Sequence, residues 1–463
     1  MREHNRTRWM AGDTHPHLRT WAVTATVIAL MLCVTSSLSG QEKVTAIKGG
    51  DIYTITSGIV TNGTILIKDG KILRIGQGFD VPKDANVVDV RGKVVMPGLV
   101  AAATMFMPAA ASSSDKIADS LDPFNYSVSL ALASGVTSIY VTGRGSRRDA
   151  AVGGATAVIK PTYGDMDNML LKEPVAESLN IASYQWMERT NFILKMRQAK
   201  EYLRKLADYE KAKAKNEKLE APRKPPDIDS YLRLLRREMP ARLSAERTGE
   251  IMKALELVDE FPFRLVIEGG TEAWTVADAI AARDVAVVLS PREKQRPNED
   301  ISQPSGSSVE NAAILKKAGV KFAIIPAVSY FGMSMGGFAG RDLMTLPMDA
   351  AAAVSGGLDE QTALEAITIT AAQILGVDDR VGSLQEGKDA DIIVLGGHPF
   401  HYDTFVELTF VNGKLMYDKG KSIYFSHIRR YDEKVPGMPS DIRQVDPDAL
   451  PPRELELQRQ AGQ

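Results

Sequence analysis

Apolar and polar residues alternate in short runs across residues 44–96, and tight turns separate the runs. Two of these turns, Asp69-Gly70 and Arg91-Gly92, each stand between two apolar runs. Alternation around such turns is typical of β-hairpins. Because isolated hairpins bury little surface, we expect these strands to pair with strands from elsewhere in the chain.

A longer apolar stretch, 94–108, is interrupted by Pro97-Gly98. This pattern predicts a strand, a sharp turn and a second, buried strand. Beyond it, residues 99–380 alternate strand-like and helix-like segments; within 131–142, for example, a helix end, Gly135 and a buried strand follow one another. Such alternation predicts an α/β fold.

Two segments depart from this alternation. Residues 184–229 are strongly charged and helical in pattern, and their last part, 221–229, is a Pro-rich linker. The charges predict a solvated inserted helix, and a binding tract is the alternative. Residues 428–463 are rich in Pro and charge, so we expect an extended tail there.

Residues 1–40 have the order of an export signal: arginines, an apolar run at 21–34, and then small residues. Ser37 and Ser39 fit the positions that precede a cleavage site, which predicts a signal peptide. The apolar run is short for a membrane span of roughly 20 residues, although an uncleaved anchor at 21–34 is the alternative. Cleavage would remove Cys33, the sole cysteine, which suits an oxidising compartment. We therefore expect a periplasmic or extracellular protein.

Composition narrows the function further. The chain has 463 residues, enough for about two or three domains, and its net charge of −2 argues against nucleic acid as a partner. All six histidines lie before residue 18 or after residue 397, so the segment 99–380 contains neither His nor Cys. A hydrolytic metal site built on imidazole or thiolate ligands is therefore excluded from this segment.

Two sequence strings stand near the two ends of the α/β segment. The first is Pro97-Gly98-Leu99, and the second is Val-Gly-Ser-Leu-Gln-Glu-Gly-Lys-Asp-Ala-Asp at 381–391. Together they resemble the amidohydrolase superfamily, and Thr-Glu-Ala at 271–273 resembles its imidazolonepropionase-like branch. The resemblance implies a hydrolase scaffold that acts, in relatives, on non-peptide C–N bonds of cyclic amides.

The resemblance also implies a domain organisation. We expect a TIM-like (β/α)8 barrel at 99–381, with the charged helical insertion 184–229 inside it. Residues 41–98 and 382–427 are expected to form one small composite β-sandwich.

In relatives, residues at the ends of barrel strands hold a divalent metal and supply the catalytic base. By the resemblance, these positions carry Ala103, Met105, Glu246, Gly269 and Ala327 in this chain. Alanine and glycine offer no side-chain ligand, and methionine sulfur suits soft ions rather than zinc-type hydrolysis. We therefore expect no metal cofactor and no catalytic residue, in contrast to the relatives.

Four further residues complete the candidate pocket: Lys160, Arg247, Glu268 and Glu272. Glu246, Glu268 and Glu272 come from adjacent predicted strand ends and together could hold Mg²⁺ or Ca²⁺. Salt bridges to Arg242 and Arg247 are the alternative reading of the three carboxylates. Lys160 is either a metal-bridging lysine or a member of an ion pair.

Serine chemistry has a weaker basis. Ser329 and Ser334 are expected near the end of the last barrel strand, and the predicted barrel holds no histidine to act as their base. A Ser–Lys pair is the arrangement that stays open.

We infer a catalytically degenerate pseudo-hydrolase whose barrel mouth keeps a pocket for a small-molecule ligand, acting as a homo-oligomer or beside an active paralogue. One alternative is a divergent hydrolase with a rebuilt carboxylate site. Another is a structural or interaction protein. Metal content distinguishes the first two hypotheses, and a ligand screen distinguishes the first from the third.

Overall fold

The computed structural model describes most of the chain between residues 43 and 425, in the ranges 43–104, 116–143, 151–152, 154–179, 181, 186–215, 220–327, 342–422 and 425. The predicted signal peptide or anchor at 1–40, the predicted tail at 428–463, Met105, Ser329 and Ser334 lie outside these residues. Within the described ranges, no helix is long and apolar enough to cross a membrane.

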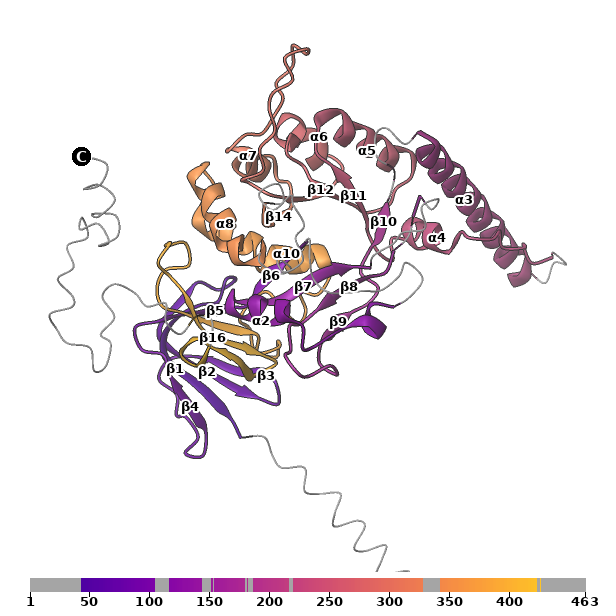
Figure 1. Ribbon diagram of the computed structural model, residues 1–463. Helices are drawn as coiled ribbons and strands as arrows, with labels where there is room; N and C mark the ends of the chain where they lie inside the picture. Colours follow the sequence, from indigo (N-terminus) through magenta and orange to yellow (C-terminus); the bar gives the residue numbers. More distant parts are fainter. Residues whose placement is uncertain are drawn as a thin grey trace, which may run out of the picture.

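Strands from both ends of the described chain form one eight-stranded sheet, seen at the bottom of Figure 1. Its strands are β1 (Thr45–Tyr53), β2 (Ile59–Lys68), β3 (Lys71–Gly76), β4 (Asn86–Asp89), β5 (Val94–Pro97), β15 (Ile392–Leu395), β16 (Val406–Val411) and β17 (Lys414–Asp418). The order is β17-β16-β15-β5-β1-β2-β3, and β4 pairs with β1. The two segments meet where β15 runs antiparallel to β5, with Ile392 opposite Pro97. Their apolar side chains share one core that includes Ile47, Ile65, Val95, Ile392 and Phe410.

One of the two predicted hairpins is confirmed and the other is wrong. β2 and β3 are antiparallel around Asp69-Gly70, both of which have positive φ. Around Arg91-Gly92, however, β4 and β5 do not pair with each other, because both run parallel to β1 along the same edge. A tight turn, in which the Lys93 N–H donates to the Val90 carbonyl, interrupts what is otherwise one extended path.

The α/β part contains two further sheets. Five parallel strands have the order β10-β11-β12-β13-β14: Glu177–Leu179, Ala241–Ala245, Leu265–Gly269, Ala286–Leu289 and Phe322–Ile324. Four strands form the second sheet, β6-β7-β8-β9: Leu99–Ala101, Val136–Thr142, Thr156–Ile159 and Leu170–Lys172. In this second sheet β8 is antiparallel to both of its neighbours.

The predicted α/β class is confirmed, but the described strands do not form one closed sheet of eight parallel strands. Two local features account for the difference. The chain reverses between β7 and β8, so that Thr142 lies opposite Thr156. The segment between α9 (Glu360–Ala366) and α10 (Ile369–Leu375) then meets β6, where the Val100 N–H donates to the Ile367 carbonyl. The core between the two sheets includes Val100, Val158, Val266, Val288 and Ala323, and α10 packs against it.

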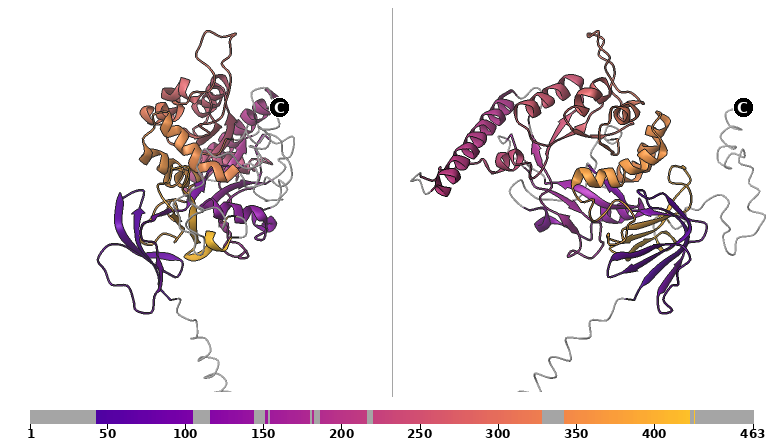
Figure 2. Two further views of the ribbon diagram at one scale, coloured as in Figure 1. Left: turned by 60° about the vertical axis from the view of Figure 1, so that its left-hand side comes forward. Right: turned by 180° about the vertical axis from the view of Figure 1, so that it is seen from behind.

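The remaining helices surround these sheets: α2 (Tyr126–Ala133), α4 (Asp229–Leu235), α5 (Thr248–Glu260), α6 (Ala277–Ala281), α7 (Asn311–Ala318) and α8 (Leu346–Ser355). The predicted inserted helix is α3 (Trp186–Ala214), which projects from the body of the molecule in Figures 1 and 2. Its first half packs against α4, where the Phe192 and Tyr231 ring centroids lie 5.8 Å apart, and an exposed ion pair of 2.7 Å joins Arg197 to Glu260 of α5. Its second half is mainly exposed and charged, consistent with a solvated insertion.

Candidate functional site

Most of the predicted site positions lie at the carboxyl ends of strands. Glu246 follows β11, Gly269 ends β12 and Ala327 follows β14; because β11 to β14 are parallel neighbours, these ends share one edge of the sheet. Ala103 follows β6, whose end reaches the same edge through a hydrogen bond from Arg242 to the Ala102 carbonyl. We call this edge the mouth. Met105 lies outside the described residues.

Arg242 of β11 occupies the interior beside the mouth and is only 3% exposed. Its Nε donates to the Glu268 carboxylate, and a terminal nitrogen donates to the Ala102 carbonyl at 2.9 Å. The guanidinium carbon lies 3.9 Å from the centre of the Tyr140 ring, a cation–π distance. Burial raises the pKa of Tyr140 to about 12, so the ring stays a neutral phenol. We call Arg242 and Glu268 the mouth pair.

From the sequence, Arg242 is predicted only as a salt-bridge partner, whereas the structure places it at the centre of the mouth. The sequence does indicate that Arg242 has an internal partner, because a guanidinium in a strand with buried neighbours must be paired inside the protein. Sequence alone could not show which carboxylate would meet it. The salt-bridge alternative is thus the one found for Glu268.

The Glu246 carboxylate is held within the β11–β12 region. Its Oε2 accepts hydrogen bonds from the Thr271 hydroxyl at 2.6 Å and from the Thr271 N–H at 3.2 Å. Burial raises the pKa of Glu246, although the Thr271 hydrogen bonds oppose the rise. Gly269 has a φ of +99°, and a Cβ at this position would lie 2.0 Å from Glu246 Oε1. The glutamate therefore fills the space that any side chain at residue 269 would need.

Glu272 has a different role from Glu268. One carboxylate oxygen accepts from the Thr248 N–H at 2.8 Å, and the other accepts from Gln295 Nε2 at 2.8 Å and from the Gly306 N–H at 2.7 Å. The last two donors belong to the loop between β13 and α7, which projects at the top of Figure 1. Glu272 is therefore the anchor of this loop.

Ala327 is buried beside a second arginine–carboxylate pair that the sequence analysis did not identify. Arg292 donates through two nitrogens to the two oxygens of Asp349, each at 2.9 Å, and Thr345 donates to the same carboxylate at 3.0 Å. Burial raises the pKa of Asp349, while Arg292, Thr345 and the Ala327 backbone act in the opposite direction. Asp349 supports the end of β14 from α8, and Arg292 engages both of its oxygens.

Lys160 does not belong to the pocket for which it was a candidate. β8 runs antiparallel to β7, so its end points away from the mouth, toward the eight-stranded sheet. There the Lys160 Nζ lies 2.7 Å from Asp389 Oδ2, 2.9 Å from Asp391 Oδ2 and 2.6 Å from Asn412 Oδ1. The ion-pair alternative therefore applies to Lys160. We call Lys160, Asp389 and Asp391 the junction cluster.

Arg247 contributes to helix formation. It is the residue before α5, and its N–H donates to the Glu250 carboxylate at 3.2 Å, as does the Glu246 N–H at 2.9 Å. These bonds satisfy donors at the start of the helix. In the described part of the chain, no ion pair joins Arg247 to the three mouth glutamates.

Among the described residues, the side chains at the mouth do not fit a divalent metal. The described residues contain no group of three His, Cys, Asp or Glu side chains arranged to hold one. Glu246, Glu268 and Glu272 each accept from different donors, and Glu268 is paired with the buried Arg242. The rebuilt Mg²⁺ or Ca²⁺ site is not formed by these three carboxylates.

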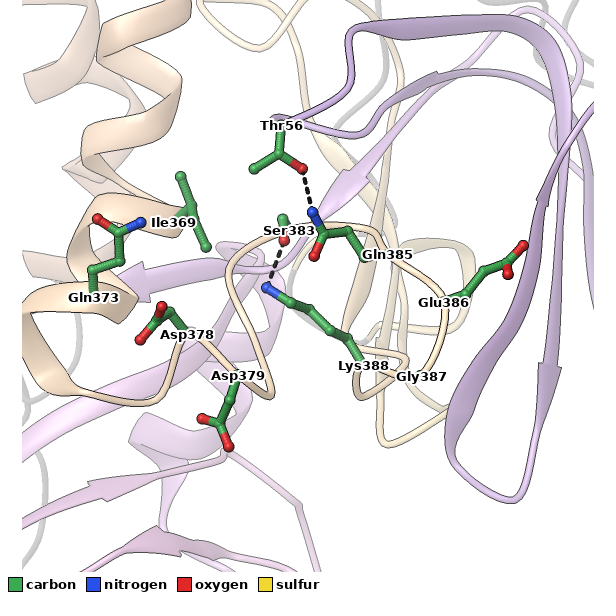
Figure 3. A pocket seen from close by; sticks show the side chains of 10 residues that line it. All are labelled: Thr56, Ile369, Gln373, Asp378, Asp379, Ser383, Gln385, Glu386, Gly387 and Lys388. Carbon is green, nitrogen blue, oxygen red and sulfur yellow. Dashed lines mark hydrogen bonds between the residues drawn. The ribbon is translucent and has the colours of Figure 1, made fainter.

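A cavity of about 460 Å³ lies near α10 and the 382–388 segment, away from the mouth (Figure 3). Lys388 Nζ points toward the Ser383 hydroxyl at 2.7 Å, and Gln385 reaches Thr56 at 2.8 Å. Burial lowers the pKa of Lys388. This is a Ser–Lys contact, but Ser383 is only 3% exposed, so its oxygen cannot approach a substrate carbonyl without rearrangement. The contact fixes the turn that returns the chain to the eight-stranded sheet.

Comparisons with known proteins agree with this architecture. The model of the amidohydrolase family matches residues 266–416. A dihydroorotase of Citrifermentans bemidjiense is 41% identical over 54 residues, and an imidazolonepropionase of Thermoplasma volcanium is 39% identical over 67 residues. These matches cover 12% and 13% of this chain, and they span only 13% and 17% of the relatives' own lengths.

Solved structures extend the likeness to most of the chain. An amidohydrolase from Thermotoga maritima has a TM-score of 0.64 and 26% identity, covering 81% of this chain and 99% of that one. Molinate hydrolase, with a TM-score of 0.50 and 15% identity over 85% of this chain and 99% of its own, shares the fold. The family match over residues 266–416 and the Thermotoga structure point the same way: this chain is similar to amidohydrolases in sequence over that segment and in fold over most of its length.

Proposed function

We propose that this protein is a non-catalytic member of the amidohydrolase family in which an internal ion pair has replaced the metal site. The observation that carries the proposal is the position of Arg242, buried at the mouth against Glu268, the Ala102 carbonyl and Tyr140. A fixed guanidinium repels a divalent cation and engages a carboxylate that could otherwise serve as a ligand.

The substituted positions support the same proposal. Ala103 and Ala327 offer no donor atoms, and Glu246 fills the space beside Gly269. A metal-activated water needs several ligands around one cation, and the loss of even a residue supporting one ligand costs about 10–100-fold in affinity or activity. We interpret the two α/β sheets as the two parts of the family barrel, which keep the scaffold without its chemistry.

The rival hypothesis, a hydrolase with a rebuilt carboxylate site, requires Glu246, Glu268 and Glu272 to converge on one ion. Their separate hydrogen bonds argue against this convergence. The other alternative is a structural or interaction protein, possessing neither catalysis nor a ligand. For the mouth itself we propose a small-molecule ligand, in a homo-oligomer or beside an active paralogue.

Elemental analysis of the purified protein tests the proposal. We expect less than one equivalent of zinc, iron or manganese, and no chelator-sensitive hydrolysis of cyclic amides or dipeptides. Restoring histidines with Ala103→His and Met105→His should not create activity, because Arg242 and Gly269 would remain. Stoichiometric, tightly bound metal together with activity that a chelator abolishes would overturn the proposal.

We also propose export, based on the order of charged, apolar and small residues at 1–40. Mass spectrometry of the protein from its native cell should find a chain that starts near Gly40. A chain that retains residues 1–39 would favour the anchor at 21–34 instead.

A further inference from the structure

A groove beside β17 gathers exposed aromatic side chains. Its volume is about 570 Å³, within the ~300–1,000 Å³ typical of small-ligand sites. Four aromatic side chains are among the exposed large hydrophobic residues of the described chain, and three of them, Phe124, Tyr126 and Tyr163, line this groove. The fourth, Tyr402, does not line it. Gathered exposed apolar side chains mark interaction sites more often than scattered ones do.

The aromatic side chains of the groove are held by their surroundings. The Phe124 and Tyr163 rings meet edge to face with centroids 5.8 Å apart. Their two loops are tied together where the Gly164 N–H donates to the Pro123 carbonyl at 3.2 Å. The Phe124 N–H is fixed by Asp122 at 3.0 Å. Phe124 is nevertheless 65% exposed. Because its loop is already held in place, a ligand that packs on the ring would lose little conformational entropy of the side chain.

The two charged residues that line the groove have opposite charges and pair with each other. Its charged lining residues are Asp418 and Lys421, which lie 3.0 Å apart, and Asp418 also accepts from the Gly420 N–H at 3.0 Å. Tyr417 lines the same groove, and burial raises its pKa to about 12, so it stays a neutral phenol. The groove therefore favours a neutral ligand with many hydrogen-bonding groups over an ionic one.

We propose that this groove binds a neutral oligosaccharide. A sugar ring has an apolar face of C–H groups, which packs on an aromatic ring, and a rim of hydroxyls, which both donate and accept hydrogen bonds. Phe124 and Tyr163 provide the stacking surface, while Ser129, Asp418 and Lys421 provide polar partners around it. The proposal concerns a surface separate from the mouth and does not depend on the loss of catalysis there.

Saturation-transfer NMR on the full chain tests the proposal with four defined probes: maltotriose, cellotriose, xylotriose and chitotriose. We expect at least one of them to bind. The double variant Phe124→Ala/Tyr163→Ala should weaken that binding by about tenfold or more, because it removes both rings of the stacking surface. Tyr402→Ala is the matched control, because it removes an exposed aromatic side chain outside the groove.

Circular dichroism and thermal unfolding would verify that each variant folds like the wild type. Two results would overturn the proposal: none of the four sugars binds at up to about 10 mM, a concentration that detects even millimolar affinity, or the folded double variant binds as the wild type does. Neither result bears on metal content, so the proposal for the mouth is tested separately.

Discussion

The junction cluster and the mouth pair lie at opposite ends of the α/β strands and differ in how completely they are buried. In the junction cluster, Lys160 and its two aspartates are almost wholly buried, and Arg380 and Lys71 also reach Asp389. In the mouth pair, Arg242 is buried but Glu268 is about one third exposed. The first cluster joins the α/β part to the eight-stranded sheet, whereas the second lies at the mouth. Removing a charge should therefore cost more at the junction than at the mouth.

The two clusters also differ in how their carboxylates titrate. Burial alone would raise the pKa of Asp389, but Lys160, Lys71 and Arg380 hold it below its usual range. Burial raises the pKa of the neighbouring Asp391 in spite of Lys160. Three cations thus stabilise the charge of Asp389, whereas Lys160 alone offsets only part of the burial of Asp391.

The largest effect is expected from Lys160→Met. The change leaves buried carboxylates without their cation, so the free energy of unfolding should fall by about 3–5 kcal/mol in urea titrations. Lys414→Met is the matched control, because Lys414 also pairs with an aspartate, Asp165, but at the surface, and should change stability by less than about 0.5 kcal/mol. Equal changes in the free energy of unfolding would show that the buried junction cluster contributes no more to stability than a surface ion pair does.

A smaller effect is expected from Glu272→Ala. The change leaves the Gly306 and Thr248 N–H groups and Gln295 without their acceptor, so stability should fall by about 2–3 kcal/mol. Amide hydrogen exchange should rise within residues 291–310 more than elsewhere. Glu299→Ala, at an exposed position of the same loop, should leave exchange unchanged. Unaltered exchange in Glu272→Ala would contradict the anchoring role.

Arg242→Met should have a still smaller effect. Glu268 is partly solvated and can recover water when its partner is lost, so we expect a fall of about 1–2 kcal/mol, part of it from the lost contact with Tyr140. Arg283→Met removes a surface pair with Asp259 and serves as the control in the same urea titrations. A loss of stability as large as that of Lys160→Met would show that the mouth pair and the junction cluster contribute equally to stability.

The smallest and most specific effect concerns Glu246→Gln. Because the pKa of Glu246 is raised in the folded state, its contribution to stability is fully present below its unfolded pKa and is lost as pH rises through its folded pKa. Glutamine does not titrate, so the stability of the wild type relative to the variant should decrease between pH 4 and pH 7. Urea titrations across this range measure the difference.

Glu201→Gln is a control for which the pH dependence of the stability difference should have the opposite sign. The hydrogen bond from Arg204 lowers the pKa of Glu201, so its contribution is present above its unfolded pKa and is lost as pH falls. A pH-independent difference between wild type and Glu246→Gln would show that burial does not perturb Glu246.

The sequence determined the features that local chemistry and chain order fix. Asp69-Gly70 makes its hairpin because both residues take positive φ, the string at 381–391 returns the chain to the first sheet, and α3 is a charged helix wherever it packs. The absence of His and Cys from residues 99–380 follows directly from the composition of that segment. These features depend on neighbouring residues or on composition.

Tertiary structure alone decided where the charges meet. Lys160 is 229 positions from Asp389 and Arg242 is 26 from Glu268, and nothing in the local sequence states which carboxylate each cation joins. The reversal at β8 carries Lys160 away from the mouth, and β4 and β5 follow one edge of β1 instead of pairing. Both outcomes depend on strand direction, which packing over the whole domain sets. A buried charge is stable only where the fold brings an oppositely charged partner to it, so the ion pairs follow from the strand directions.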